Sequence, residues 1–185
     1  MSIVPPPVRR LFGLKKRSEE IPLRAFKEFE ASVNLIEDYE HVAGNFLGKI
    51  REVCPGIKLL LLSFDAETGR FACVASAGAS DEDVRNAVFP RGARLVKWLK
   101  VNETRLELPK RPGVGEYLTP RERDVLAAIG VEIAFPLISM NRLIGILLAG
   151  SKPGRAAFTM VDVGFIASLL PQASIALENA LLFRK

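Results

Sequence analysis

The 185-residue sequence has few of the residues that usually carry enzymatic or metal chemistry, with one histidine and two cysteines. The histidine, His41, lies on a predicted helix between Glu40 and Val42, and nothing in the sequence supports the serine and carboxylate pairing of a Ser-His-Asp site, so an exposed helical histidine is expected. Cys54 and Cys73 lack the close spacing of a zinc site or a redox pair, and such sparse cysteine suits a reducing compartment. We therefore predict a cytoplasmic protein that is not an enzyme and has no metal ligand.

Long apolar runs and phosphate-binding loops are also missing. No uninterrupted apolar run reaches the roughly 18 residues needed to span a membrane, and the first residues lack the apolar segment of a signal peptide. Neither GxxxxGK[ST] nor GxGxxG occurs, and Gly113-Val114-Gly115 is too short to count as such a loop. We expect no membrane span and no phosphate loop.

The net charge of +5 arises in the first 17 residues. That segment holds five basic residues and no acid, namely Arg9, Arg10, Lys15, Lys16 and Arg17. The remaining 21 basic residues balance the 21 acidic ones. A nucleic-acid-binding domain usually carries its basic face on the folded part, so we do not predict a nucleic-acid partner. We expect residues 1–21 to form a flexible basic leader and residues 22–185 to form one domain.

The hydrophobic pattern predicts an α+β domain. Apolar residues recur at three- and four-residue steps from Leu23 to Val53 and again over 162–184, which predicts a long helix at each end. Between these helices, strand-like segments predict two hairpins, at Ile57–Ala77 and Ile133–Gly150, separated by short helices and one short strand at Glu103–Leu108. This order indicates a central antiparallel sheet flanked by helices, with the two terminal helices packed together.

Local signals refine this outline. Thr119–Glu122 (TPRE) forms a capping box that starts a helix, Gly130 ends that helix, and Ser80 is an N-cap candidate for an earlier one. Pro136 predicts an edge position or a bulge in its strand, and Pro171 predicts a kink in the last helix.

The stretch from Ile57 to Lys185 resembles a GAF domain. The resemblance rests on an ordered set of positions: Gly130 at the end of a helix, Pro136-Leu137 in a strand, Gly145 in the next strand, Ala176–Ala180 (ALENA) near the end of the closing helix, and Arg94–Leu99 (RLVKWL) as a short pocket-side helix. It implies a ligand pocket on one face of the sheet, roofed by short helices and loops. It also implies signalling through the first and last helices, which in this family commonly pack together and against a second subunit.

Departures from the family patterns limit what is carried over. Ser151-Lys152, Phe158 and Asp162-Val163 match the cyclic-nucleotide-binding branch only in part, so we do not predict cyclic nucleotide binding and assign Lys152 and Asp162 to a structural ion pair. Neither cysteine matches the bilin-attachment context. The methionine-sulfoxide-reductase branch needs several cysteines in its active-site region, which this sequence lacks.

The implied pocket and the pairing helices give two sets of candidate residues. For the pocket we assign the walls to Phe64, Leu95, Trp98, Tyr117 and Phe135, with Arg91, Arg94 and Asn102 reading a polar or anionic ligand. The alternative is that the aromatic side chains fill the core and leave no usable cavity. For dimerisation and signalling we assign Phe29, Val33, Ile36, Ala173, Ala176, Leu177 and Ala180. The alternative is that the terminal helices satisfy each other within a monomer.

The sequence therefore predicts a non-enzymatic sensory or regulatory domain of GAF type. It would bind an unidentified small molecule, form a homodimer through its terminal helices, and act on a signalling effector such as a kinase, a cyclase or a transcription regulator. A second hypothesis is a dimerisation scaffold with a filled pocket and no ligand. An enzyme, and a nucleic-acid binder that uses the leader, are weaker rivals. The sequence leaves the cofactor unknown.

Overall fold

The computed structural model describes residues 39–108 and 113–183 of the chain. Its elements are α2 (Tyr39–Val53), β1 (Leu59–Asp65), β2 (Arg70–Ala77), α3 (Asp81–Asn86), β3 (Phe89–Pro90), α4 (Arg94–Asn102), β4 (Leu106–Glu107), α5 (Val114–Tyr117), α6 (Pro120–Ile129), β5 (Val131–Ser139), β6 (Arg142–Gly150), a 3-10 turn (Pro153–Arg155) and α7 (Met160–Phe183). The predicted leader, and the part of the first predicted helix before Tyr39, lie outside the described residues.

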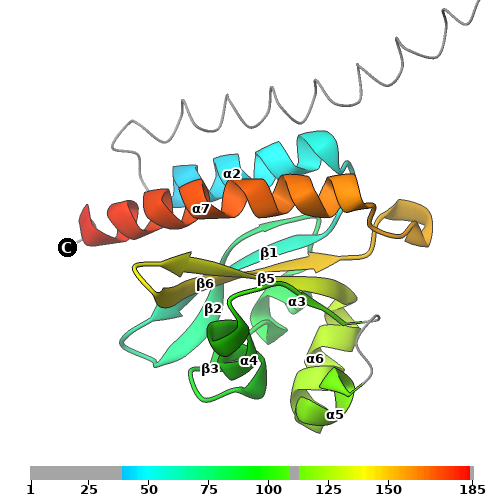
Figure 1. The fold of residues 1–185 in the computed structure, drawn as a ribbon, viewed down its shortest axis with the longest axis horizontal. Coiled ribbons are helices and arrows are strands. Elements are labelled where there is room, and N and C mark those ends of the chain that lie inside the picture. The colour runs from blue at the N-terminus through cyan, green and yellow to red at the C-terminus, as the bar shows by residue number, and fades with distance from the viewer. Residues whose placement is uncertain (1–38, 109–112, 184–185) are drawn as a thin grey trace, which may run out of the picture.

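The strands form one antiparallel sheet in the order β3-β2-β1-β6-β5-β4. Helices α2 and α7 lie along one face of this sheet and pack against each other, and α3 to α6 lie on the other side (Figure 1). The predicted α+β class, the single antiparallel sheet and the contact between the terminal helices are therefore confirmed.

Strand β1 joins the two predicted hairpins into one sheet. It pairs with β2 on one side, Leu59 opposite Ala77, and with β6 on the other, Leu59 opposite Ala149. Gly145 lies in this central region, where β6 pairs with β1. The position requires glycine, because a Cβ there would come within 2.8 Å of the Leu62 carbonyl oxygen. A side chain there would push β6 away from β1.

The β5–β6 hairpin shows how local sequence sets register. Met140 and Asn141 both have positive φ, 47° and 58°, as a two-residue type I′ turn requires. Strand β5 pairs with β4 only at Ile133 and Ala134, so Pro136 lies beyond the end of β4, where the missing N–H costs no ladder bond on that side. The register shift expected near Pro136 lies at Leu137 and Ile138.

Each face of the sheet carries its own apolar cluster, because successive side chains of a strand point to opposite faces. On β5, Ile133, Phe135 and Leu137 join the cluster under α2 and α7. Ala134 joins the cluster under the short helices. The sheet thus separates two cores.

Capping boxes start three helices. Thr119 with Glu122 caps α6 as predicted, and Ser80 with Asp83 caps α3. In the third, Thr159 and Asp162 exchange bonds between side chain and backbone N–H, so α7 begins at Met160, two residues before the predicted start. The structure also adds β3 and α5 where the sequence suggested loops, and shortens the predicted strand at Glu103–Leu108 to two residues.

Helix α7 is long and apolar enough, by length and composition, to cross a membrane. Half of its most apolar window is buried inside the fold, however, and core helices pass the same test. This is weak evidence for a span.

Candidate functional site

The two predicted ligand-reading arginines contact predicted wall residues. Arg94 donates from Nη1 to the Tyr117 carbonyl oxygen at 2.8 Å, and its guanidinium lies 5.7 Å from the centroid of the Tyr117 ring. The Arg91 guanidinium lies 5.7 Å from the centroid of the Phe64 ring. Both arginines are exposed, so the structure places these two cation–aromatic pairs at the periphery of the α3–α6 face.

The residues of α4 fill the middle of this face. Leu95 is fully buried and Trp98 is half-buried, both in the cluster on the sheet. Asn102 is exposed and donates from Nδ2 to the Trp98 carbonyl oxygen at 2.8 Å, which satisfies the end of the helix. The packing supports the alternative in which these side chains form core.

Phe135 does not belong to this group. It is fully buried in the cluster under α2 and α7, on the opposite face of the sheet from Leu95 and Trp98. The prediction that it shares a pocket wall with Trp98 is therefore wrong. Strand alternation makes Phe135 a partner of Ile133 and Leu137, whereas Ala134 faces the short helices.

Glu122 is a buried carboxylate that holds two helices together. The sequence showed only its part in the capping box with Thr119. One oxygen accepts from the backbone N–H and the hydroxyl of Thr119, both at 2.8 Å, and the other accepts from the Leu95 N–H at 3.0 Å. Burial alone would raise the pKa of Glu122, but these donors outweigh it and lower the pKa. Because Ala93 gives α4 no side-chain cap, Glu122 caps the first turns of two helices.

Asp162 anchors the start of α7. Its Oδ2 accepts from Lys152 Nζ at 2.8 Å and from the N–H and hydroxyl of Thr159 at 2.7 and 2.8 Å. The Cys54 thiol, just after α2, donates to Oδ1 at 3.5 Å. Burial would raise the pKa of Asp162, but Lys152 and Thr159 outweigh it and lower the pKa. Asp162 thus joins the segment after β6, through Lys152, and the end of α2, through Cys54, to the start of α7.

Glu178 anchors the second half of α7. Its carboxylate is 7% exposed and accepts hydrogen bonds from the Ser139 hydroxyl and from the Arg142 guanidinium, one residue on each side of the β5–β6 turn. Helix α7 is therefore held by one buried carboxylate near each end.

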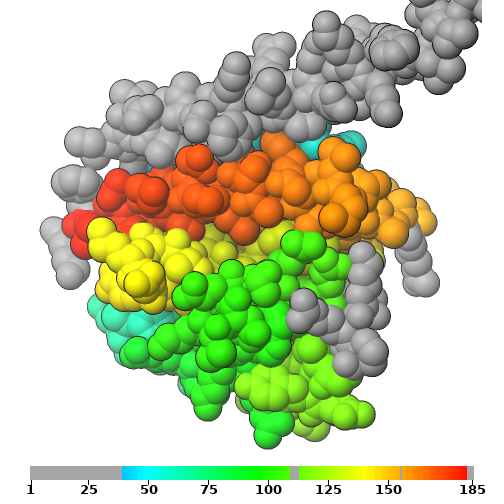
Figure 2. Space-filling model, in the orientation of Figure 1, coloured from blue at the N-terminus to red at the C-terminus, as the bar shows by residue number. Residues whose placement is uncertain are grey.

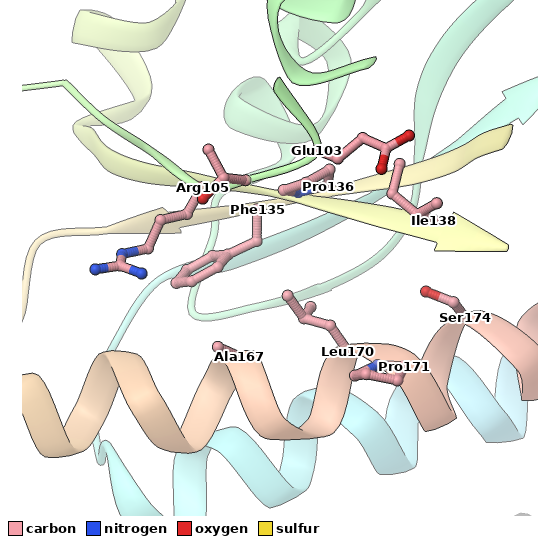
Figure 3. A pocket seen from close by; sticks show the side chains of 10 residues that line it. Glu103, Arg105, Phe135, Pro136, Ile138, Ala167, Leu170, Pro171 and Ser174 are labelled. Atoms are coloured by element: carbon pink, nitrogen blue, oxygen red, sulfur yellow. The ribbon is translucent and has the colours of Figure 1, made fainter. Parts of the chain in front are cut away.

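A hollow of about 290 Å³ lies between these two anchors, under the middle of α7 (Figure 3). Its lining comes from α7, from β5 and from the segment that follows α4: Glu103, Thr104, Arg105, Phe135, Pro136, Ile138, Ala167, Leu170, Pro171 and Ser174. Phe135 is the one predicted pocket residue in this lining. Three segments far apart in the sequence meet here, and no local motif marks the site.

The residues predicted to pair α7 with a partner are core residues. Ala173, Ala176, Leu177 and Ala180 are at most 8% exposed and pack within the cluster formed with α2 and the sheet. Phe29, Val33 and Ile36 lie outside the described residues. The four α7 residues are buried because α7 lies against both α2 and the sheet, so two of its faces are covered within one chain.

The two thiols are poorly suited to nucleophilic chemistry. Burial, then the Asp162 carboxylate, raises the pKa of Cys54 to about 12, and burial raises the pKa of Cys73. Cys54 lies in the cluster under α2 and α7, whereas Cys73 packs against the opposite one. Within residues 39–108 and 113–183, no three His, Cys, Asp or Glu side chains are grouped to hold a metal ion.

No protein-family model and no curated protein matches the sequence. Solved structures match the fold. A GAF domain/HD domain protein from Geobacter sulfurreducens gives a TM-score of 0.66 at 20% identity, over 80% of this chain and 97% of that chain. The GAF domain of a phosphoenolpyruvate-protein phosphotransferase from Coxiella burnetii gives 0.66 at 17% identity, over 89% and 97%. Free methionine-R-sulfoxide reductase from Neisseria meningitidis, with its substrate, gives 0.61 at 15% identity, over 88% and 91%.

Proposed function

The chain has the GAF-domain fold, and from this premise we propose that it is a non-enzymatic regulatory domain that pairs with a second copy through α7. The observation that carries the proposal is the outer face of that helix. After Met160, which is also exposed, the exposed residues of α7 follow one another at three- and four-residue steps: Val161, Gly164, Ser168, Pro171, Ile175, Asn179 and Leu182, which we call the outer stripe. None of them is charged.

An uncharged outer face is unusual for a helix at the surface of a domain, where charged and polar residues normally face water. Helix α7 has only two ionisable side chains, Asp162 and Glu178, and both are buried. Meanwhile Val161, Ile175 and Leu182 are 61%, 54% and 60% exposed. Figure 2 shows the surface of α7, orange to red, open along this side of the molecule.

The spacing of the stripe favours a partner helix. Val161, Ser168, Ile175 and Leu182 are separated by seven residues each, the repeat that keeps one line of side chains facing a second helix. Gly164 and Ser168 are small enough to let the two backbones approach. A second copy of α7 presents the same stripe, and a twofold axis brings identical surfaces together.

The absence of an enzymatic role is part of the proposal. The raised pKa values of Cys54 and Cys73 keep both thiols protonated near neutral pH, and the thiolate is the nucleophilic form. A GAF domain of similar fold belongs to a phosphoenolpyruvate-protein phosphotransferase, which supports a role beside an effector domain. The packed α3–α6 face favours, as a second candidate, a scaffold that pairs without a ligand on that face.

The test is the oligomeric state of the full chain by sedimentation equilibrium. We expect a dimer for the wild type, and a dissociation constant raised by more than about tenfold for Ile175→Lys, because two like charges then face each other across the interface. Val101→Lys is the matched control, since Val101 is 80% exposed on α4, away from α7. A monomeric wild type, or equal effects of the two variants, contradicts the proposal.

A further inference from the structure

The hollow under α7 has the form of a small-molecule site. Ala167, Leu170, Pro171 and Ser174 form its floor, and their spacing of three and four residues puts them on one face of the helix. Phe135 and Ile138 come from the facing strand (Figure 3). A volume of about 290 Å³ is near the lower end of the range for ligand pockets.

Ser174 gives this hollow a hydrogen-bonding group that has no partner. Its side chain is 1% exposed, and its Oγ makes no hydrogen bond in the structure. In Figure 3 the hydroxyl points from α7 into the space toward β5. Burying a hydroxyl without a partner is destabilising, so a molecule that supplied the missing bond would bind at a site already prepared for it.

Pro171 lies on the same face of the helix. Proline has no N–H, so it cannot donate the helical hydrogen bond that the Ala167 carbonyl would otherwise accept. Both Ala167 and Pro171 line the hollow. The floor therefore combines apolar surface with the Ser174 hydroxyl, which can accept a hydrogen bond.

The charged residues of the lining favour a neutral ligand. Arg105 is its cation, and Arg105 Nε already donates to the Glu107 carboxylate at 2.8 Å. Glu103, at the rim, carries a negative charge and is exposed. An anion would meet Glu103 without an uncommitted cation from the lining to offset it.

We propose that this hollow binds a compact, neutral, mostly apolar molecule that carries one hydroxyl or N–H group, which donates to Ser174 Oγ. An apolar cavity of about 150 Å³ holds benzene, so about a dozen non-hydrogen atoms fit here. The site lies on the opposite face of the sheet from the pocket that the family resemblance implied. It uses the inner face of α7 and meets the outer stripe at one residue, Pro171, so ligand binding and pairing have to be measured separately.

The test uses indole and indene, which share a shape but differ in the N–H group, with the full ¹⁵N-labelled chain. We expect indole to shift the amide resonances of residues 167–170 and 172–174 and to bind roughly tenfold more tightly than indene, since one good hydrogen bond is worth about 1.4 kcal/mol. Ser174→Ala should abolish this difference in affinity. The same variant should raise the melting temperature of the free protein by about 2–4 °C, because it removes an unpartnered buried hydroxyl.

A blocking variant separates this site from others. Ala167→Phe should fill the hollow and abolish binding of both probes, whereas Ala66→Phe, in the exposed β1–β2 loop, should leave binding unchanged. The proposal is overturned if neither probe binds at millimolar concentration, if Ala167→Phe binds indole normally, or if the shifts map to α4 and α6. Sedimentation of the same variants keeps the result distinct from the pairing proposal.

Discussion

The helices on the two faces of the sheet are held in place by different interactions. On the α3–α6 face, helices of four to ten residues are too short to be stable alone, and side chains cap and brace them. Glu122 bonds the first turns of α4 and α6, and Arg94 bonds the carbonyl end of α5 at Tyr117. Arg94 and Asn102, two of the three polar residues expected to read a ligand, are used in this bracing.

On the other face, one helix of 24 residues is fixed at two points. Asp162 and Glu178 hold its two halves, and buried apolar residues such as Ile166, Leu169 and Ala173 hold the stretch between them. There the small side chain of Ala167 and the ring of Pro171 leave the hollow open. The difference teaches that a long helix, anchored near its ends, tolerates a packing defect that a set of short helices does not.

The sharpest way to break this comparison is to enlarge one alanine on each face. Ala134 is fully buried under the short helices, so Ala134→Leu should cost about 3 kcal/mol of unfolding free energy through overpacking. Ala167 lines the hollow, so Ala167→Leu should change stability by less than about 0.5 kcal/mol. Urea denaturation of both variants measures the contrast. Equal losses would mean that the two faces are packed alike.

Much of the fold follows from local chemistry that the sequence displays. The Thr119–Glu122 box and Gly130 bound α6 as expected, because both capping motifs are complete within a few residues. The hairpins follow from strand-like segments on either side of turn residues. These signals need no knowledge of the rest of the chain.

The site was less predictable because it depends on long-range placement. Alternation along β5 separates Phe135 from Ala134, but it does not say which helices cover which face. The bond from Leu95 to Glu122 joins residues 27 positions apart, and the hollow joins three separate segments. The outer stripe of α7 has a seven-residue spacing that the sequence displays, but other sets of α7 residues share that spacing. Only the packing of α7 against α2 and the sheet decides which set is exposed.

The next largest effect should come from the anchor at the start of α7. Asp162→Asn removes the charge that holds Lys152 and Thr159, and hydrogen bonds to charged groups are worth about 2 kcal/mol. Because the folded state lowers the pKa of Asp162, the carboxylate stabilises the fold above its ordinary pKa, and that contribution is lost as the pH falls through the lowered value.

This sign gives a second readout for the same variant. The difference in unfolding free energy between wild type and Asp162→Asn should be full near neutral pH and shrink below about pH 4. Urea titrations from neutral to acidic pH measure it. A difference that stays constant with pH would mean that the charge of Asp162 contributes nothing to the anchor.

The smallest effect should come from the other anchor, at Arg142. Its side chain is 69% exposed, so its ion pair with Glu178 is screened by water and salt. Arg142→Ala should cost less than about 1 kcal/mol of unfolding free energy, because the Ser139 hydroxyl still holds Glu178. Adding salt should reduce that cost further, because salt screens the exposed ion pair. Urea midpoints at low and high salt measure the change. A loss as large as that of Asp162→Asn would show that both ends of α7 are held equally, and the hollow would then lie between two equivalent anchors.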